Sequence, residues 1–262
     1  MTTVDLHELR DLAMRLASQA TSLVMDGLHK TRTSVTTKSS AVDLVTETDK
    51  ASEKLIVESI RAARPGDGFI GEEGTDIAST TGVRWVIDPI DGTTNFVYGH
   101  PGFGVSIAAQ LNGHTVVGVV HDCMLGEQFV AVQGEGATRN GQPIWCSSST
   151  KLATSLIATG FSYDARRRVE QATKVASIIG QVRDIRRRGS AALDLCWVAC
   201  GRVDAYYEAH VNPWDIAAGE IIVREAGGRT APLDAAHPTG SIVASGPQLF
   251  DAFRALLEQT GS

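Results

Sequence analysis

The segment from Trp85 to Phe96, with the sequence WVIDPIDGTTNF, constrains the fold of this chain most strongly. Residues 85–87 form an apolar, β-prone run, and a proline follows two positions later. Because proline has no N–H group to give to a sheet, we expect the strand to end at Asp88. Gly92 permits a tight turn, and the Thr-Thr-Asn sequence after it suits a helix N-terminus, where free N–H groups favour an anion. The segment therefore predicts an anion site beside two aspartates.

Asp88 and Asp91 flank the carbonyl group of Ile90 and offer oxygen ligands on a short loop. Two ionised carboxylates about 4 Å apart repel each other by roughly 4 kcal/mol at an effective dielectric constant near 20. Protonation of one aspartate or a bound divalent cation would offset this repulsion. Mg²⁺ is the first candidate, because it binds carboxylates together with substrate phosphate. The alternative is an ordinary Asp-Pro turn stabilised by local hydrogen bonds.

The chain of 262 residues is short enough for one hydrophobic core. We expect a single domain over residues 1–262, made of a sheet-rich half up to about residue 145 and an α/β half from about residue 146. A hydrophobic content of 43% and a charged content of 21% are typical of globular proteins and not of disordered ones. The formal net charge of −6 argues against nucleic-acid binding driven by overall charge.

The four cysteines have neither metal-ligand spacing nor the density of a disulfide-rich secreted protein, so we expect reduced, mostly buried thiols. Residues 1–30 lack the layout of a signal peptide. No stretch approaches the roughly 18 apolar residues of a membrane span. These features predict a cytoplasmic protein that does not bind membranes.

Residues 6–24 carry apolar side chains at helical spacing and predict an amphipathic helix. The alternating residues 42–49 predict a short strand or extended segment, and residues 50–64 predict a second helix with Asp49 at its N-cap. A brief strand at 69–71 precedes the adjacent carboxylates of Glu72 and Glu73, which on their own are equally typical of a solvated loop. The β-branched runs at 103–109, 116–120 and 128–132 predict hairpin strands.

The second half alternates between strands and helices, which indicates an α/β layered domain. The predicted strands lie at 155–159, 182–185, 203–207 and 241–245. The predicted helices lie at 166–179, 190–201, 215–226 and 249–257, the third with Asp215 as its cap. Two arginine clusters, at 166–168 and 186–188, are more typical of a solvated helix face or a subunit contact than of nucleic-acid binding in so acidic a chain. No motif for serine catalysis or for a nucleotide cofactor is present.

Three short motifs together resemble the signatures of the inositol monophosphatase family, namely Gly71-Glu72-Glu73, the Asp88 to Phe96 sequence DPIDGTTNF, and Trp214-Asp215. The middle motif is highly specific, and the weaker flanking motifs occur in the family's order. The likeness extends from Asp43 to Gly228. It implies a mixed α/β (α+β) fold, the layered α-β-α-β-α sandwich of the Mg²⁺-dependent, lithium-sensitive phosphatases that include fructose-1,6-bisphosphatase.

The resemblance also implies a role for each matching residue. Those implied to bind two or three Mg²⁺ ions are Glu72, Asp88, the Ile90 carbonyl, Asp91 and Asp215. The backbone N–H groups of Gly92 and Thr93 match the phosphate-binding positions. Thr93 and Glu72 match the pair that activates the attacking water, and Asp49 matches the acid that accepts the Thr93 hydroxyl proton. The groups implied to face the substrate hydroxyls are Asp91, Ala191, Glu208 and Asp215.

These assignments predict hydrolysis of inositol-1-phosphate or a similar small polyol phosphate by metal-activated water, without a covalent enzyme intermediate. Glu208 favours inositol, because one carboxylate can accept two vicinal hydroxyl protons, although a surface glutamate without a substrate role remains an alternative. Other possible substrates are histidinol phosphate and sugar or nucleotide phosphates. A binding protein of the transcription machinery is a further alternative. The resemblance also implies lithium inhibition and a homodimer.

Overall fold

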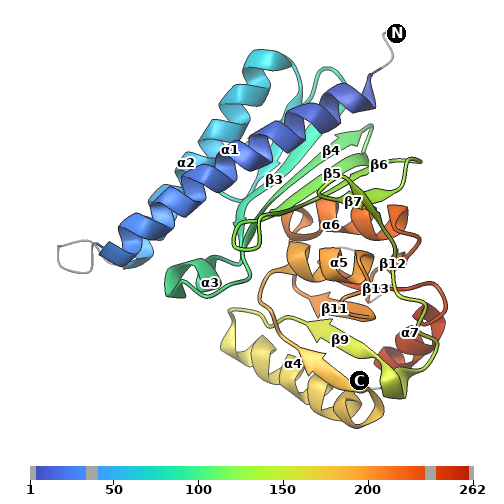
Figure 1. Cartoon of the computed structure of the whole chain (residues 1–262). Coiled ribbons are helices and arrows are strands. Elements are labelled where there is room, and N and C mark those ends of the chain that lie inside the picture. Colours follow the sequence, from blue (N-terminus) through green and yellow to red (C-terminus); the bar gives the residue numbers. More distant parts are fainter. Residues whose placement is uncertain (1–3, 34–40, 234–239, 260–262) are drawn as a thin grey trace.

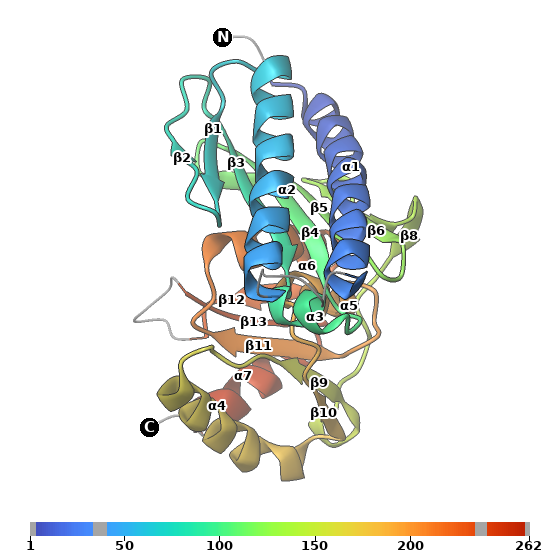
Figure 2. The same cartoon turned by 90° about the vertical axis from the view of Figure 1, so that its left-hand side faces the viewer.

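The computed structural model describes residues 4–33, 41–233 and 240–259, which fold into alternating layers of helices and sheets (Figures 1 and 2). Helices α1 (Leu6–Thr33) and α2 (Ala41–Ala63) cover one face of a large sheet, and α5 (Ala191–Ala199) and α6 (Pro213–Glu225) cover its other face. A smaller sheet follows, with α4 (Ala165–Ile178) and α7 (Phe250–Gln259) on its far side. The predicted α-β-α-β-α layering is confirmed.

The large sheet has eight strands in the order β2-β1-β3-β4-β5-β6-β7-β8, of which β1 and β3 are parallel and the other neighbours antiparallel. The strands are β1 (Gly68–Gly71), β2 (Asp76–Ile77), β3 (Val83–Asp91), β4 (Gly104–Leu111), β5 (His114–Asp122), β6 (Glu127–Val132), β7 (Ala137–Arg139) and β8 (Gln142–Ile144). Three of them match the predicted hairpin strands.

Strand β3 contains the first part of the central motif, up to Asp91. It pairs with β4 in regular register as far as Asp88 opposite Ser106, and the register then shifts before Asp91 pairs with Gly104. Pro89 lies within the shift, where it has no N–H to give to the ladder. The regular ladder therefore ends at Asp88 as expected, and one further pair forms beyond the proline.

The small sheet has five strands in the order β10-β9-β11-β13-β12. The strands are β9 (Leu156–Thr159), β10 (Asp184–Arg186), β11 (Ala205–Ala209), β12 (Arg229–Ala231) and β13 (Ser241–Ser245). Strand β11 extends two residues beyond the predicted strand, so that Glu208 lies inside it. A core of buried side chains between the two sheets includes Tyr206 from this sheet, Leu195 from α5 and Val120 from the large sheet.

The prediction for residues 42–49 is wrong, because α2 begins at Ala41 and the predicted strand is its first part. Asp49 therefore lies inside a helix and does not cap one. Asp49, Ser52, Ile56 and Ile60 are all buried and follow one another at intervals of three or four residues, as one face of a helix requires. Polar residues on this buried face concealed the helical spacing. Residues 34–40, which precede this segment, lie outside the part of the chain that the structure describes.

Three further predictions concern the cysteines, membrane-spanning segments and the helix after Gly92. All four cysteines are free thiols, and Cys123 and Cys196 are buried. Among the described helices, none combines the length and the apolar character needed to cross a membrane. Helix α3 (Thr93–Tyr98) begins directly after Gly92, as the turn signal predicted.

Candidate active site

Every candidate residue except Asp49 lines one pocket of about 180 Å³. These residues are Glu72, Asp88, Ile90, Asp91, Gly92, Thr93, Ala191, Glu208 and Asp215. They come from the two sheets and from three helices, which meet at this point. The remaining lining residues, which no sequence argument singled out for this site, are Gly160, Phe161, Ser162, Tyr163, Arg187, Gly189, His210, Val211 and Asn212.

The turn between β3 and α3 lines the pocket. Asp88 is 2% exposed, and its Oδ1 accepts a 3.0 Å hydrogen bond from the Ile90 N–H. The Thr93 hydroxyl donates to the Ile90 carbonyl oxygen at 3.1 Å. Gly92 has a φ of 93°, and a Cβ atom there would lie 2.7 Å from the carbonyl oxygen of Gly102. Both the left-handed backbone and the close approach therefore require glycine at this position.

The N-terminus of α5 holds the side chain of Asp91. Its Oδ2 accepts a 2.7 Å hydrogen bond from the Ser190 hydroxyl and a 2.6 Å bond from the Ala192 N–H. Ser190 is also the N-cap of α5, because its Oγ accepts the Leu193 N–H. A carboxylate is favoured at this position by the free N–H groups of the first helical turn. Asp91 is thus oriented by a helix that begins a hundred residues later in the chain.

Asp215 enters the pocket from the first turn of α6. Asn212 is the N-cap of this helix and Pro213 its first residue, so the prediction that Asp215 is the cap is wrong. Asp215 instead closes a capping box from the third helical position, where its Oδ2 accepts a 2.6 Å bond from the Asn212 N–H. The same carboxyl group is hydrogen-bonded to Asp88.

Glu72 follows β1 and reaches Asp88 across the pocket through a side-chain hydrogen bond. Asp49 lies beside it in α2, with 4% of its surface exposed. Its Oδ1 atom is buried and has no hydrogen-bond partner among the described residues. The Thr93 hydroxyl, which the family resemblance pairs with Asp49, donates in this structure to the Ile90 carbonyl oxygen. Asp49 therefore keeps a free acceptor atom beneath the site.

Glu208, on β11, also lines the pocket. Its Oε2 accepts a 2.6 Å hydrogen bond from the hydroxyl of the buried Tyr206. A Cβ atom on Gly160 would overlap the Glu208 carboxylate, so glycine makes room for this side chain. Burial raises the pKa of Glu208 to about 7. Tyr206 and Gly160 thus fix the position of a carboxyl group that is hard to ionise.

Burial and mutual repulsion raise the pKa values of the acidic groups in the site. The pKa of Asp49 rises to about 8, mainly because the group is buried and then because Glu72 is near. Burial likewise raises the pKa of Glu72 to about 7 and that of Asp91 to about 8, with the charge of Asp215 contributing to both. For Asp88 the pKa lies well above its usual range, owing to burial and then to Glu72. The protein alone therefore does not stabilise all these groups as carboxylates.

The donor set fits a hard divalent cation. Mg²⁺ prefers carboxylate and carbonyl oxygens, and the pocket provides such atoms from both ends of the β3–α3 turn and from α6. In the described part of the chain, no three acidic, histidine or cysteine side chains surround one point as metal ligands do. The Asp88 carboxyl group instead forms hydrogen bonds with Glu72 and Asp215. A divalent cation held by these groups would offset their mutual repulsion.

Glu53 is a buried residue near the site that the sequence reading assigned no role. It lies one turn after Asp49 in α2, is 3% exposed, and accepts hydrogen bonds from the Glu73 N–H at 2.9 Å and the Thr75 hydroxyl at 2.5 Å. Those two residues belong to the loop that carries Glu72. An acidic residue four positions after a candidate acid, on the same helix face, was the signal that could have identified it.

Comparison with known proteins decides the family. A model of the inositol monophosphatase family matches residues 5–261. The chain belongs to the inositol monophosphatase family. Its fold is similar to a solved inositol monophosphatase from Anabaena (Nostoc) sp. PCC 7120, at 36% identity and a TM-score of 0.87 over 98% of this chain and 97% of that one. A solved Mycobacterium tuberculosis SuhB is similar at 39% identity and a TM-score of 0.87 over 99% of both chains.

Curated relatives of this inositol monophosphatase family member have two kinds of name. The Nus factor SuhB of Pasteurella multocida is 43% identical over 249 residues, which cover 93% of each chain. The inositol-1-monophosphatase of Mycobacterium bovis is 41% identical over 272 residues, covering 96% of this chain and 93% of the relative. Family membership supports a phosphatase activity, and the two names make a transcription role a second possibility.

Proposed function

We propose that the protein is a Mg²⁺-dependent phosphatase that hydrolyses inositol-1-phosphate or a similar small polyol phosphate. The observation that carries the proposal is the convergence of carboxylates from Glu72, the β3–α3 turn and α6 on one pocket, beside the glycine turn at the N-terminus of α3. Such a pocket has an acidic end that suits metal ions and a turn that suits an anion. Binding a phosphate ester together with metal ions requires both the acidic groups and the anion-binding turn.

The groups that would hold two or three Mg²⁺ ions are Glu72, Asp88, the Ile90 carbonyl, Asp91 and Asp215. When bound, the metal lowers the pKa of a coordinated water and stabilises the negative charge that develops on the ester during hydrolysis. The hydrogen bonds to Asp91 from Ser190 and Ala192 keep one oxygen of that carboxylate turned toward α5. This preorganisation lowers the reorganisation needed when charge develops in the site.

The residues of the turn would bind and orient the phosphate and the attacking water. The backbone N–H groups of Gly92 and Thr93 are at the N-terminus of α3, where no earlier carbonyl of the helix is available to them. They would donate to phosphate oxygens. The Thr93 hydroxyl and the Glu72 carboxylate would orient a water for in-line attack, with Glu72 accepting its proton and Asp49 accepting the Thr93 hydroxyl proton.

Glu208 and the residues beside it would recognise the alcohol part of the substrate. Glu208 would accept hydrogen bonds from vicinal hydroxyl groups, next to Ala191 at the start of α5 and to the outer oxygens of Asp91 and Asp215. The name of the Mycobacterium bovis relative supports inositol-1-phosphate as the first substrate to test. Histidinol phosphate and sugar or nucleotide phosphates are the competing substrates.

A panel of phosphate monoesters assayed with and without Mg²⁺ tests this function. We expect Mg²⁺-dependent phosphate release, with inositol-1-phosphate among the best substrates. A strong preference for histidinol phosphate would contradict the proposed substrate, but it would still be consistent with Mg²⁺-dependent hydrolysis of a phosphate monoester. Absence of Mg²⁺-dependent release from every ester would overturn the proposed function.

A second candidate function is binding to the transcription machinery, which relatives named Nus factor SuhB at 40% and 43% identity favour. The exposed Arg166, Arg167 and Arg168 on α4 offer a charged surface for such a partner. The variant Asp88→Asn separates the two functions, because an adaptor does not need the carboxylate. Loss of phosphate release together with an unchanged cellular phenotype would favour the adaptor.

A further inference from the structure

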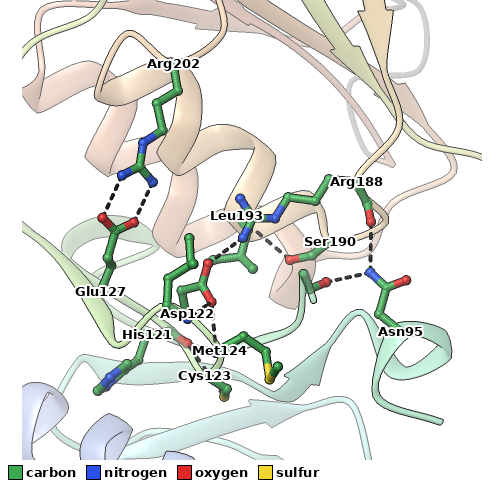
Figure 3. A network of polar contacts seen from close by, with 12 residues as sticks. Asn95, His121, Asp122, Cys123, Met124, Glu127, Arg188, Ser190, Leu193 and Arg202 are labelled. Carbon is green, nitrogen blue, oxygen red and sulfur yellow. Dashed lines mark hydrogen bonds and ion pairs between the residues drawn. The ribbon is translucent and has the colours of Figure 1, made fainter. Parts of the chain in front are cut away.

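Arg188 belongs to an exposed arginine cluster by sequence, yet its side chain is buried. The Arg188 side chain is 10% exposed, whereas the Arg186 side chain is 49% exposed. The Arg188 Nη2 donates to the Asp122 Oδ2 at 2.5 Å, and the Asp122 side chain is completely buried. The guanidinium group also lies over the Trp197 ring, 3.9 Å from its centroid. The expectation of a solvated or subunit-contact face is therefore wrong for this residue (Figure 3).

The main chain of Arg188 contacts the helix that follows the phosphate turn. Its carbonyl oxygen accepts a 2.8 Å hydrogen bond from the Asn95 Nδ2 (Figure 3). The same amide nitrogen donates to the Gly102 carbonyl at 2.7 Å. Gly102 has a φ of 113°, and a Cβ atom on it would lie 3.0 Å from the Arg188 Cγ. The side chain of Arg188 thus passes close over the backbone that supports α3.

The next two residues contact the turn itself. The carbonyl oxygen of Gly189 is 3.2 Å from the position that a Cβ atom on Gly92 would occupy. Ser190 donates to the Asp91 carboxylate at 2.7 Å. Arg188, Gly189 and Ser190 therefore each contact a different part of the segment 91–95, which contains the carboxylate and the N–H groups assigned to metal and phosphate.

The side chain of Arg188 ties residues 188–190 to the large sheet at the β5–β6 turn. Asp122 is the last residue of β5, and its Oδ1 accepts the N–H groups of Met124 and Leu125 in the turn that follows. Its position is therefore set independently of Arg188. A buried ion pair of this kind holds its partners in one arrangement, because separating them would leave a charge unpaired in a low-dielectric environment.

We propose that Arg188 is a positioning residue for the active site. Its ion pair with Asp122 and its stacking on Trp197 hold residues 188–190 in the place where they orient Asp91 and the Gly92 turn. Arg188 is not among the residues that line the pocket, whereas Arg187 and Gly189 on either side of it are. The expected effect on Mg²⁺ binding rests on the proposed function. The inference extends that function to residues outside the pocket.

Arg202 offers a matched control. It makes a two-pronged ion pair with Glu127, the first residue of β6, at 2.5 and 2.6 Å, and it lies 5.5 Å from the centroid of the same Trp197 ring. It thus joins the same hairpin to the same tryptophan. Figure 3 shows its ion pair with Glu127. Among the described residues, it forms no hydrogen bond with the segment 91–95. A purely structural clamp would make the two arginines equivalent.

The test compares the full-length variants Arg188→Met and Arg202→Met with the wild type. Mg²⁺ binding is measured by titration calorimetry, and amide hydrogen exchange of the segment 91–95 is measured by mass spectrometry without metal. We expect Arg188→Met to weaken Mg²⁺ binding about tenfold or more, as the loss of a residue supporting the ligands does, and to speed exchange in this segment. Arg202→Met should leave both quantities close to the wild-type values.

Two further variants keep the test decisive if Arg188→Met does not fold. Ser190→Ala removes the hydroxyl bond to Asp91 without touching the ion pair between Arg188 and Asp122, and it should weaken Mg²⁺ binding in the same way. Arg188→Lys retains the charge opposite Asp122 and should restore part of the wild-type affinity. Unchanged binding and exchange in the Arg188 and Ser190 variants, or an equal loss in Arg202→Met, would overturn the proposal.

The same measurements separate this inference from the proposed function. If the wild type neither binds Mg²⁺ nor releases phosphate, the proposed function is wrong. Hydrogen exchange in segment 91–95 still decides the positioning role in that case, because it requires neither metal nor substrate. Faster exchange in Arg188→Met but not in Arg202→Met would support the positioning role, and equal exchange would refute it.

Discussion

The Glu53 carboxylate accepts a 2.9 Å hydrogen bond from the main-chain N–H of Glu73, so helix α2 holds the loop that presents Glu72. The other carboxylate oxygen accepts the Thr75 hydroxyl at 2.5 Å. A Cβ atom on Gly71 would overlap this carboxylate, and the glycine therefore permits the close approach. One buried glutamate thus fastens both sides of a loop whose function depends on its shape.

Replacement of this glutamate should damage both stability and activity. We expect Glu53→Ala to lower the free energy of unfolding by roughly 2 to 4 kcal/mol. Two hydrogen bonds to a charged group are lost, and their donors are left without an acceptor. Catalysis should fall about tenfold or more, because Glu72 loses its support. Urea denaturation and a phosphate-release assay measure the two effects. Glu58→Ala is the control, since that side chain is 67% exposed on the same helix, and an equal effect there would contradict the prediction.

Loss of one acidic group in the site should have opposite effects on function and on metal-free stability. Asp88→Asn should abolish Mg²⁺-dependent phosphate release. In the presence of a chelator its melting temperature should equal or exceed that of the wild type, because a buried carboxyl group with an unfavourable environment is gone. Mg²⁺ at about 100 times its dissociation constant should stabilise the wild type by roughly 2.7 kcal/mol. Mg²⁺-induced stabilisation of the variant would argue against the ligand role of Asp88.

The stability of the metal-free protein should fall as the pH rises from 6 to 9. The pKa values of Asp49 and Asp91 are raised to about 8 and that of Glu72 to about 7, all above the range of these groups in an unfolded chain. The folded state therefore binds more protons over this interval, and its stability is lost as the pH passes through the folded pKa values. Thermal melting in a chelator at several pH values measures the trend, and a rising melting temperature would refute it.

Metal binding should couple to the same protons. Because Mg²⁺ replaces protons on the acidic groups, its affinity should increase with pH, and protons should be released when it binds near neutral pH. Titration calorimetry in two buffers of different ionisation enthalpy counts the released protons. Asp88→Asn should release fewer protons or none. Binding without proton release in the wild type would show that the site is already ionised before the metal arrives.

The position of Glu208 should control which alcohols are accepted. Glu208→Gln should raise KM for inositol-1-phosphate more than for a phosphate ester that lacks vicinal hydroxyl groups, because an amide accepts fewer hydrogen bonds than a carboxylate. Gly160→Ala should have the same selective effect, since its Cβ atom would overlap the Glu208 carboxylate. Steady-state kinetics with the two esters measure the ratio. An equal rise of KM for both esters would refute a role in recognition.

The local parts of the site were predictable from neighbouring residues. The end of the regular β3 ladder follows from Pro89, and the turn into α3 follows from Gly92, whose left-handed conformation glycine adopts without strain. The family motifs also identified residues that line the pocket far apart in the chain, from Glu72 to Asp215. Their assigned roles as ligands, base and recognition groups stay predictions.

The errors occurred where tertiary contacts override local preference. The segment 42–49 alternates like a strand, but residues 41–63 form one helix whose buried face includes polar groups such as Asp49 and Ser52. A polar residue on a buried face has no signature in a hydrophobicity pattern. The cap of α6 was placed at Asp215, because the pattern could not tell an N-cap from the third position of a capping box.

The sequence by itself determined a layered α/β protein with a turn for an anion beside two aspartates, because proline, glycine and β-branched residues act through their own backbone preferences. Only the tertiary structure decided which distant groups meet around the site, such as Ser190 and Asp91, Glu53 and the Glu73 backbone, and Arg188 and Asp122. Hydrogen bonds and ion pairs between distant residues depend on where folding brings them together. Local residue preferences carry no record of that arrangement.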